Sequence, residues 1–588
     1  MKPRIPRPFL LLILSALTLA LATVWPARAA EPAKADSLTR VLPSGALGFV
    51  EVDNLAGQIQ RLRQSLLVKL VLESPEYGEA IKAPQYKQGM AFIKVAENIL
   101  DMDVWKFADT LLGGQLSIAL YPKADSKQPE PLVILRTPDA AGLEKMRLRL
   151  APLVALAGEK IQRKEEAGGM ETFQLDDKLF VALHKNWIVA SPNRDLALRA
   201  IALLGGEKGA SLADDAPVAK LREQMGANHF VQVGVNLEAL RKSINARMNM
   251  PAQFDNGAAS LLFQAVAELA VRSPYFGATL DVDDKGFALV TGLAGGPKDL
   301  KPEHQWYFSD PKTGGTPPLP AVPGLIGGFS TYGDFSQWYR NREKLLVERV
   351  QPEFDKFESG IKTLLPGRDF ADDVLPALGR TITFVAAQQN YDHLGGGQPA
   401  MKLPGFALVF ELAKPQEGGD LFQLLFQTIA TLTNFGAAES GNQPWVMMAE
   451  NYKDTSISLM RHLKKPEGKQ LPVVYNFMPC AARMGNRFVL TSSPSLCRQL
   501  VDAFQKPPAA ATANKNLNIE LFPIELAALA QNNLDLLTAQ AVQGGKDADQ
   551  AKRGIEALLK VLRTIESAKL FSTVKEDRFQ FRLEGHWK

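Results

Sequence analysis

The sequence has few of the side chains that enzymes use for covalent, redox or metal chemistry. Among 588 residues there are two cysteines and six histidines, and no two histidines stand at the spacing of a metal-binding motif such as H-E-x-x-H. Nor does a G-x-x-x-x-G-K-[ST], G-x-G-x-x-G or G-x-S-x-G motif occur. We therefore predict a non-catalytic protein without a cofactor or metal. We expect each histidine to be a surface or turn residue: His184, His229, His304, His393, His462 and His586.

The sequence also has little surplus charge once its first 29 residues are set aside. That segment contains four basic residues and no acidic one. Without it, the 67 basic residues of the chain fall to 63, which equals the 63 acidic residues. The isoelectric point of about 8.7 for the whole chain therefore gives no ground for predicting nucleic acid or an acidic membrane as a partner.

Long apolar runs are missing everywhere except at the N-terminus. There, basic residues precede an apolar run from Phe9 to Trp25, and Ala27 and Ala29 supply the small residues that a signal peptidase reads. We predict a signal peptide over 1–29 and export to the periplasm or cell envelope of a bacterium. An uncleaved anchor helix is the alternative, although the run is short for a membrane span and ends at Pro26.

What the sequence does contain is internal similarity. PSGALGFVEVDNL (43–55) has a counterpart in PGLIGGFSTYGDF (323–335), and Phe107-Ala108-Asp109 has one in Phe370-Ala371-Asp372. Later, LFVALHKNWIVASP and PCAARMGNRFVLTSSP each indicate a strand, a turn, a strand and a Ser-Pro that opens a helix. Because the matching segments occur in the same order, we predict a tandem duplication. Two unrelated domains with chance matches are the alternative.

Four polar residues are expected to cap helices in the two copies. Asn54 and Asp334 follow the first predicted strand of each copy, where a side-chain oxygen can accept a bond from a free helical N–H. Ser191 and Ser493 each precede a proline, which suits the first position of a helix.

Each copy mixes predicted strands with amphipathic helices, and the terminal hairpins indicate antiparallel pairing. We therefore predict an α+β fold, in which a tandem duplication repeats a unit with helices packed on an antiparallel or mixed β-sheet. The expected order is a signal peptide (1–29), a first α+β copy (30–293), a Gly/Pro-rich linker (294–322) and a second α+β copy (323–588).

Both cysteines fall in the second predicted copy, Cys480 on a strand and Cys497 in the first turn of the helix that follows. In an exported protein such a pair is expected to form a disulfide, worth about 3 kcal/mol in the chain-entropy model. Two buried free thiols are the alternative. A catalytic thiol is disfavoured because no histidine is adjacent in sequence.

Three further stretches imitate functional motifs. Residues 281–286 begin like a calcium loop, but Lys285 stands at the third ligand position, so we expect a hairpin turn. His393 lies in the Gly-rich loop QQNYDHLGGGQP, which we interpret as solvated and flexible. Asp372 and Asp373 could act as general acid and base, but adjacency in sequence does not establish convergence in space.

Several of these features together resemble a known family. The predicted signal peptide, the segment from Pro43 to Leu55, the segment from Phe107 to Gly114 and the hairpin that ends at Ser191-Pro192 are similar to exported bacterial proteins that carry the domain of unknown function numbered 3352. The resemblance covers most of the chain after the signal peptide. It implies no established activity and no catalytic residues. The second copy, the Gly-rich loop and the cysteine pair depart from a simple member.

The leading hypothesis is a non-catalytic exported protein that binds an envelope partner or has a structural role, with no nucleic acid and no transmembrane span after signal cleavage. One alternative is a carrier of an apolar ligand such as a lipid, because several predicted helices are rich in Leu, Phe and Ala. The other is an unrecognised hydrolase whose site is assembled from residues distant in sequence.

Overall fold

The structure is a computed structural model that describes residues 37–588 except 65–68, 70–71, 73–76, 79–80, 124–125, 127, 157–160, 167–169, 176–177, 208, 227–228, 244–252, 309–313, 440–443, 465, 507–513, 546 and 576. The predicted signal peptide lies outside the described residues. The chain forms two compact units, one from residues up to 248 with 273–293, the other from 249–272 with 294–588.

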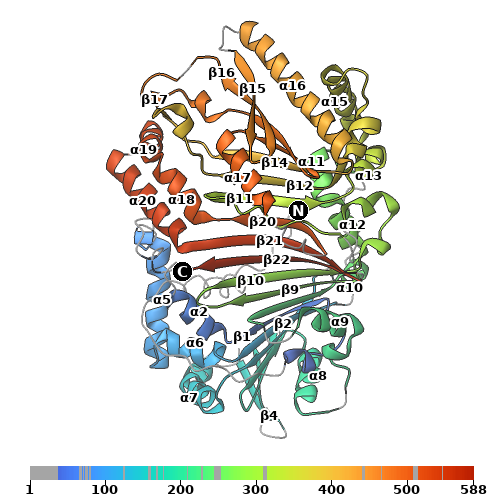
Figure 1. Ribbon diagram of the computed structural model, residues 1–588. Helices are drawn as coiled ribbons and strands as arrows, with labels where there is room; N and C mark the ends of the chain where they lie inside the picture. The colour runs from blue at the N-terminus through green and yellow to red at the C-terminus, as the bar shows by residue number, and fades with distance from the viewer. Residues whose placement is uncertain are drawn as a thin grey trace. The chain divides into compact units, whose positions relative to one another are not determined.

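The first unit contains an antiparallel sheet whose described strands pair in the order β4-β5-β6-β7-β3-β2-β1-β8-β9-β10 (Figure 1). Its strands are β1 (Gly48–Asp53), β2 (Gln115–Tyr121), β3 (Glu130–Arg136), β4 (Ile161–Glu166), β5 (Met170–Leu175), β6 (Leu179–His184), β7 (Trp187–Ser191), β8 (Val231–Asn236), β9 (Tyr275–Val282) and β10 (Gly286–Ala294). Its α-helices are α2 (Leu55–Gln64), α5 (Pro84–Leu100), α6 (Val104–Leu112), α7 (Ala140–Leu156), α8 (Arg194–Leu204), α9 (Ala216–Met225) and α10 (Leu237–Ser243), with short 3₁₀ turns η1 (Leu38–Arg40) and η4 (Leu212–Asp214).

Alternation of side chains along the strands forms the core of this unit. In β2, every second residue from Gln115 to Tyr121 is buried, as expected for a strand with one packed face. Helix α8 covers that face, since Leu196, Ala197 and Ala200 belong to the same buried cluster as residues of β2, β3 and β7.

The second unit contains a second set of antiparallel strand pairs, in the order β15-β16-β18-β19-β14-β12-β11-β20-β21-β22, and a short parallel pair of β13 with β17. Strand β15 is the last in this order. The strands are β11 (Leu325–Tyr332), β12 (Leu378–Ala387), β13 (Gln398–Pro399), β14 (Gly405–Leu412), β15 (Trp445–Tyr452), β16 (Thr455–His462), β17 (Gln470–Leu471), β18 (Cys480–Met484), β19 (Arg487–Thr491), β20 (Lys515–Leu521), β21 (Ile565–Lys575) and β22 (Arg578–Trp587).

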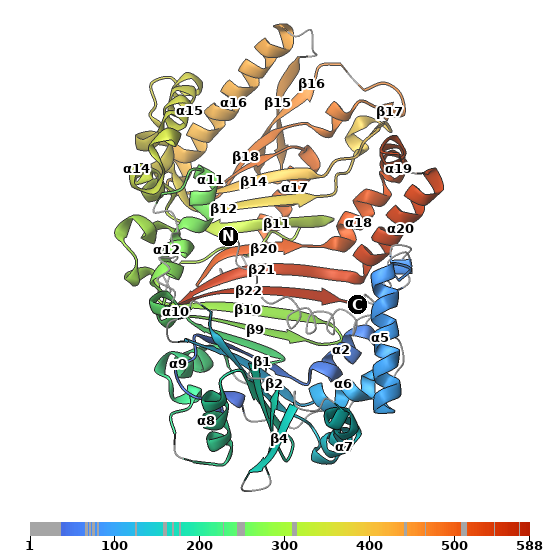
Figure 2. The ribbon, with the colours of Figure 1, turned by 180° about the vertical axis from the view of Figure 1, so that it is seen from behind.

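Helices and helical turns of several kinds surround these strands (Figures 1 and 2). The α-helices are α11 (Gly257–Ala259), α12 (Ala265–Arg272), α13 (Phe335–Arg340), α14 (Arg342–Leu345), α15 (Gln351–Leu364), α16 (Pro415–Glu439), α17 (Pro494–Gln505), α18 (Pro523–Gln531), α19 (Leu534–Gln543) and α20 (Ala548–Thr564). The π-helical turns are η5 (Ser260–Gln264) and η9 (Phe370–Val374). The 3₁₀ turns are η6 (Pro297–Asp299), η7 (Pro302–Tyr307), η8 (Glu348–Val350), η10 (Leu375–Ala377), η11 (Asp392–Leu394) and η12 (Val473–Asn476).

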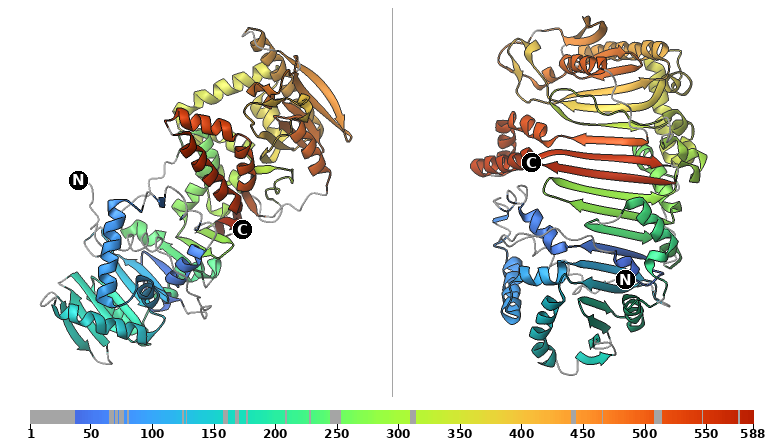
Figure 3. Two further views of the ribbon diagram at one scale, coloured as in Figure 1. Left: turned by 90° about the vertical axis from the view of Figure 1, so that its left-hand side faces the viewer. Right: turned by 60° about the horizontal axis from the view of Figure 1, so that its bottom comes forward.

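Helix α16 packs on the strands of this unit through one apolar stripe. Phe422, Phe426 and Ala430, spaced four residues apart, belong to one buried cluster with Phe488 of β19 and Met460 of β16. This spacing puts the three side chains on one face of the helix. At another part of the unit, α18, α19 and α20 lie at one end of β20 to β22, as the red elements in the right-hand view of Figure 3 show.

The prediction of a tandem duplication is wrong. The fold is mixed, with 45% helix and 31% strand, and is not clearly a duplicated unit. The two strand orders run alike, but the surrounding elements differ. The Phe-Ala-Asp motif lies on α-helix α6 in the first unit and on π-helical turn η9 in the second, and α11 and α12 follow β8 in the chain yet belong to the second unit. The prediction rests on similar segments that occur in the same order along the chain. That order does not show which hydrophobic core each segment packs on.

Hydrogen bonds explain why residues after 252 belong to the second unit. Phe254 N–H donates to the carbonyl of Leu345 at 2.9 Å, and the side chain of Gln264 donates to the same carbonyl at 2.9 Å. The indole of Trp338 donates to the hydroxyl of Ser260 at 3.2 Å. Partners so distant in sequence leave no signal in local residue patterns.

The segment 294–322 is packed rather than a loose linker over its described part. Trp306, Tyr307 and Phe308 are buried, and the ring of Phe308 meets that of Phe579 edge to face at 5.6 Å between centroids. Aromatic side chains bury large areas, so their presence outweighs the Gly and Pro content of this stretch.

The expected helix caps hold at three positions out of four. Asn54, Asp334 and Ser493 each accept a bond from the backbone N–H three residues ahead. Ser191 does not cap α8, because that helix begins three residues later, at Arg194, and Asn193 is its cap. The Ser191 hydroxyl instead donates to the carbonyl of Pro131 at 2.9 Å.

Candidate functional site

A pocket of about 1180 Å³ opens in the second unit where α16 ends. It lies among the last turns of α16, the paired ends of β15 and β16, and the chain that leads through β17 into η12. Its lining residues are Thr433, Gly436, Ala437, Trp445, His462, Lys464, Glu467, Leu471, Pro472, Val474 and Tyr475. A cavity in the first unit has only about 10 Å³, which is room for about one water molecule. The large pocket is therefore the candidate site.

Three rings form the wall of this pocket. The rings of Trp445 and His462 lie 3.9 Å apart between centroids at 33°, and those of His462 and Tyr475 lie 4.9 Å apart at 58°. The first contact follows from the antiparallel register, in which Trp445 pairs directly with His462. Cross-strand neighbours of this kind have side chains within contact distance.

A two-residue turn sets that register. Lys453 and Asp454 connect β15 to β16, and both have positive φ, 45° and 63°. Two successive positive φ angles are typical of the type I′ turn, whose twist matches that of the flanking strands. The hairpin is therefore fixed at the end opposite to the pocket.

Asn434 fixes the start of β15 to α16. Its side-chain nitrogen donates to the carbonyl of Trp445 at 2.8 Å, and its side-chain oxygen accepts from the N–H of Trp445 at 2.7 Å. These reciprocal bonds hold the indole at the mouth of the pocket without using polar groups of the indole itself.

His462 is the histidine among the residues that line the pocket, and its protonation state decides whether the aromatic wall is charged. The residue is 6% exposed, and its Nε2 lies 3.4 Å from the carbonyl oxygen of Val474. Burial lowers the pKa of His462, and hydrogen bonds to the carbonyls of Val474 and Phe477 offset this only in part. The imidazole is thus neutral at neutral pH, and the aromatic wall carries no charge.

The Gly-rich loop around His393 is solvated at Asn390, Asp392 and Gln398, as expected, but part of it packs against residues that line the pocket. Leu394 and Tyr475 form a buried cluster with Leu471, while His393 itself faces solvent. Gly395 and Gly396 have positive φ, 64° and 91°, a conformation that glycine adopts without a steric penalty. The glycines serve a tight turn rather than flexibility.

A buried amide holds this loop to η12. Asn476 is 1% exposed, and its side-chain nitrogen donates to the carbonyls of Met401 and Val473, each at 2.8 Å. Its oxygen accepts from the Tyr391 hydroxyl at 2.6 Å and from the Leu403 N–H at 2.9 Å. With every bond satisfied, the network gives the pocket a fixed floor.

The cysteine pair lies apart from the residues that line the pocket. Cys480 and Cys497 are free thiols, both buried in one apolar cluster. The thiol of Cys480 donates to the carbonyl of Met478 at 3.1 Å. Burial raises the pKa of Cys497 to about 12, and it raises that of Cys480 as well. Neither is a nucleophile at neutral pH, and the disulfide stays a prediction.

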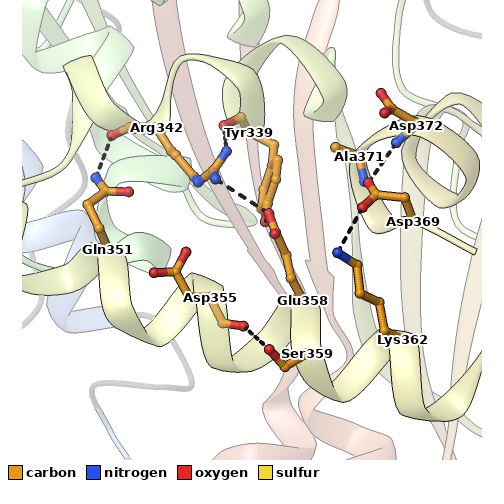
Figure 4. Close-up of polar contacts among 10 residues, drawn as sticks. All are labelled: Tyr339, Arg342, Gln351, Asp355, Glu358, Ser359, Lys362, Asp369, Ala371 and Asp372. Atoms are coloured by element: carbon orange, nitrogen blue, oxygen red, sulfur yellow. Dashed lines mark hydrogen bonds and ion pairs between the residues drawn. The ribbon is translucent and has the colours of Figure 1, made fainter.

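The structure does not bring Asp372 and Asp373 together as an acid and base. The carboxylate of Asp373 accepts from the backbone N–H of Asp369 at 2.7 Å and pairs with Arg368 at 3.2 Å. Asp372 is exposed. Figure 4 shows Asp369 capping the turn through bonds from the N–H groups of residues 371 and 372.

A second polar group in Figure 4 ties α13, α14 and α15 together. The phenol of Tyr339 donates to the carboxylate of Glu358, and the guanidinium of Arg342 lies 4.5 Å above the Tyr339 ring. Burial and the bond to Glu358 raise the pKa of Tyr339. A phenol that stays protonated cannot act as a base or nucleophile, so this cluster is a structural tie.

Other sequence-predicted positions are structural. Residues 281–286 form the β9–β10 hairpin turn, where Asp283 accepts from the N–H groups of Lys285 and Gly286, each at 2.8 Å; the expected turn is confirmed. His229 binds Asp281 at 2.7 Å. His304 is buried and not at the surface. Within the described ranges, no group of three or more His, Cys, Asp or Glu could hold a metal.

Sequence reasoning missed the pocket, although one signal for it was present. The Lys453-Asp454 turn lies midway between Trp445 and His462. If this hairpin had been predicted from the sequence, the two residues would also have been predicted to be cross-strand neighbours. Tyr475 could not have been found in this way, because its position depends on the buried Asn476 network.

Comparisons with known proteins add little. No protein-family model and no curated protein matches the sequence. Solved structures of TP0453 in crystal forms IV and III match 44% and 45% of this chain and 79% and 80% of their own, at 10% and 12% identity and TM-scores of 0.23 and 0.22. Likeness this low carries no argument about fold or function. Among the described helices, none is long and apolar enough to cross a membrane.

Proposed function

We propose that this protein is a non-catalytic binding protein of the bacterial cell envelope, and that its second unit holds an apolar or amphiphilic small molecule. The observation that carries this proposal is the pocket of about 1180 Å³ with its wall of three rings in contact. Small-molecule sites typically occupy roughly 300–1,000 Å³ and are lined mainly by apolar side chains, so this pocket has room for a long ligand.

The lining favours an amphiphile over a fully polar ligand. Trp445, Pro472 and Val474 offer apolar contact area, and the charged groups in the lining are Lys464 and Glu467. Apolar contact stabilises a bound molecule by about 25 cal/mol per Å² removed from water. A ligand with an apolar body and a polar end could contact both the apolar and the charged residues of the lining.

Support for export comes from the sequence. The predicted signal peptide over 1–29 and the resemblance to exported proteins carrying the domain of unknown function 3352 both favour the periplasm or cell envelope. A binding protein there meets lipids and other amphiphiles at high local concentration.

A glycine in the pocket wall allows a sharp test. A Cβ added at Gly436 meets no atom within 4 Å, so the side chain of Gly436→Leu begins in open space at the pocket lining. Gly360 on α15 also has open space around an added Cβ and does not line the pocket, so Gly360→Leu is the matched control. Both changes favour the helix by up to about 1 kcal/mol, and neither is expected to unfold the protein.

We expect Gly436→Leu to weaken binding of the naphthylamine dye N-phenyl-1-naphthylamine by about tenfold or more, measured by fluorescence titration, which corresponds to about 1.4 kcal/mol. Gly360→Leu should bind the dye as the wild type does. Native mass spectrometry of the wild-type protein from its own cell envelope would then identify the natural ligand. Equal affinity of both variants, or no dye binding by any form, would contradict the proposal.

A further inference from the structure

The outward face of α16 is apolar and has no cover among the described residues. Leu424, Ile429, Leu432 and Phe435 are exposed, and Phe435 is 65% exposed. The sequence from 421 to 438 contains no charged residue. The opposite face of the same helix is buried in the core. The exposed polar residues among the described positions of this stretch are Gln427, Thr431 and Thr433, so both sides of this part of α16 are uncharged.

Such a helix is unusual in water. A surface helix normally carries charged and polar residues on its outer face, and a contiguous exposed apolar patch marks an interaction site. Met447 and Met448 of the neighbouring strand β15, both 40% exposed, add further exposed apolar side chains to this part of the unit.

The hydroxyl groups of three threonines of α16 are hydrogen-bonded within the helix, so these residues can enter a hydrocarbon environment. The hydroxyls of Thr428, Thr431 and Thr433 each donate to the carbonyl four residues earlier, at 3.0, 2.9 and 2.8 Å. Because these donors are satisfied within the helix, they do not need water. A protein partner would be expected to meet directional polar groups at its rim, whereas hydrocarbon requires none.

Basic residues border the end of this helix. Arg461 near the end of β16, and Lys464 and Lys469 between β16 and β17, are exposed. The exposed acidic residues beside them are Glu467 and Glu439, the last residue of α16. Lys464 lines the same pocket as Gly436 in the last turns of α16, which places the cation beside the apolar face. Anionic lipid headgroups attract exposed basic residues near a membrane surface by about 1 kcal/mol each.

We propose that the outward face of α16 docks on an anionic lipid surface. Its apolar side chains enter the boundary between headgroups and acyl chains, and Arg461, Lys464 and Lys469 meet the headgroups, as in other interfacial helices. This inference goes beyond the pocket, because it rests on the exposed face of the helix. Its consequence for the pocket is that the opening beside Lys464 faces a source of amphiphiles.

The test is co-sedimentation of the protein, as its own cells produce it, with vesicles of equimolar phosphatidylglycerol and phosphatidylcholine. Phe435→Glu puts a charge on the docking face. Leu558→Glu is the matched control, because Leu558 on α20 is 58% exposed. We expect Phe435→Glu to lower the bound fraction by about tenfold or more and Leu558→Glu to bind like the wild type.

A charge pair tests the headgroup contact. Lys464→Glu should lower binding to the mixed vesicles, while Lys560→Glu on α20 should not, and pure phosphatidylcholine should bind less protein than the mixture. Equal binding by Phe435→Glu and the wild type would overturn the proposal, as would no binding by the wild type. A dimer in solution that Phe435→Glu abolishes would assign the face to a second copy and overturn it too.

The two proposals fail separately. Phe435 is not among the residues that line the pocket, so Phe435→Glu should leave dye binding unchanged. Gly436→Leu should leave vesicle binding unchanged. If the wild type binds vesicles but not the dye, only the proposal for the pocket is contradicted. If Phe435→Glu binds vesicles as well as the wild type does, only the proposal for the docking face is contradicted.

Discussion

His462 shows how burial turns an ionisable side chain into part of an apolar wall. The ring is held between Trp445 and Tyr475, and burial lowers its pKa below the ordinary value of 6.5. Protonation would place a charge between two aromatic rings where little water can solvate it. The same residue type on the surface would have titrated freely near neutrality.

This lowered pKa predicts the sign of a pH effect on stability. Between the folded pKa and about pH 6.5, the unfolded chain binds the proton that the folded ring refuses, so the free energy of unfolding falls as pH falls through this range. Above about pH 6.5 His462 has no such effect. We expect His462→Phe to reduce the loss of stability between about pH 7.5 and about pH 5.

The measurement is urea unfolding of the wild type and His462→Phe at both pH values. Comparing the pH-dependent loss of stability in the two proteins isolates His462 from other titrating groups, such as the buried His304, whose pKa is also lowered by burial. An identical pH dependence in both proteins would show that His462 is not the group described.

The hydrogen bonds of Asn476, which hold the floor of the pocket, could not be predicted from the sequence. An asparagine with four hydrogen bonds to three separate stretches of chain looks, in sequence, like any turn residue. The partners are as many as 85 residues away. Local preference identifies what a residue can bind but not what the fold brings to it.

At the scale of elements, the β15–β16 hairpin rests on the backbone of its turn. Asp454 has φ 63°, which costs most residues roughly 1–2 kcal/mol but glycine almost nothing. We expect Asp454→Gly to be more stable than Asp454→Ala by about 1 kcal/mol. The order should reverse at the exposed helical position Lys552 in α20, where glycine is less stable than alanine by about 1 kcal/mol.

Unfolding in urea would check this prediction. The Ala-to-Gly difference at each position is the quantity to compare, since it removes the loss of the original side chain. If glycine were no better than alanine at position 454, the turn would not have the left-handed backbone that sets the register of Trp445 and His462.

Elements were predictable from sequence where local chemistry decides them, and not where tertiary contacts do. The β18–β19 hairpin and the Ser493 cap followed from a turn and a proline. By contrast, Ser191 had the same local pattern, yet Asn193 became the cap. The duplication failed for a related reason, because the order of similar segments does not determine which core α11 and α12 join.

At the scale of the whole molecule, the charge balance depends on the first 29 residues. The whole chain has a net charge of +4 and an isoelectric point of about 8.7. Removal of four basic residues leaves equal numbers of acidic and basic groups. We expect the chain without residues 1–29 to focus near neutrality.

Isoelectric focusing of protein from the cell envelope, with mass spectrometry of its N-terminus, checks this expectation. Retention of the segment would keep the isoelectric point near 8.7 and favour the anchor-helix alternative. The mass of the intact protein would also report whether Cys480 and Cys497 have lost two hydrogens on forming a disulfide.

The position of β15 at the end of its strand order has a consequence for self-association. Only β16 pairs with it among the described strands. Beyond Trp445, whose backbone N–H and carbonyl are bound by Asn434, its second row of backbone groups is a template onto which another extended chain could add. Methionines 447 and 448 would make that addition favourable. Glu450 is the charged residue of β15 and makes two bonds of 2.7 Å to Arg498, so its charge opposes such addition most strongly when this ion pair is open.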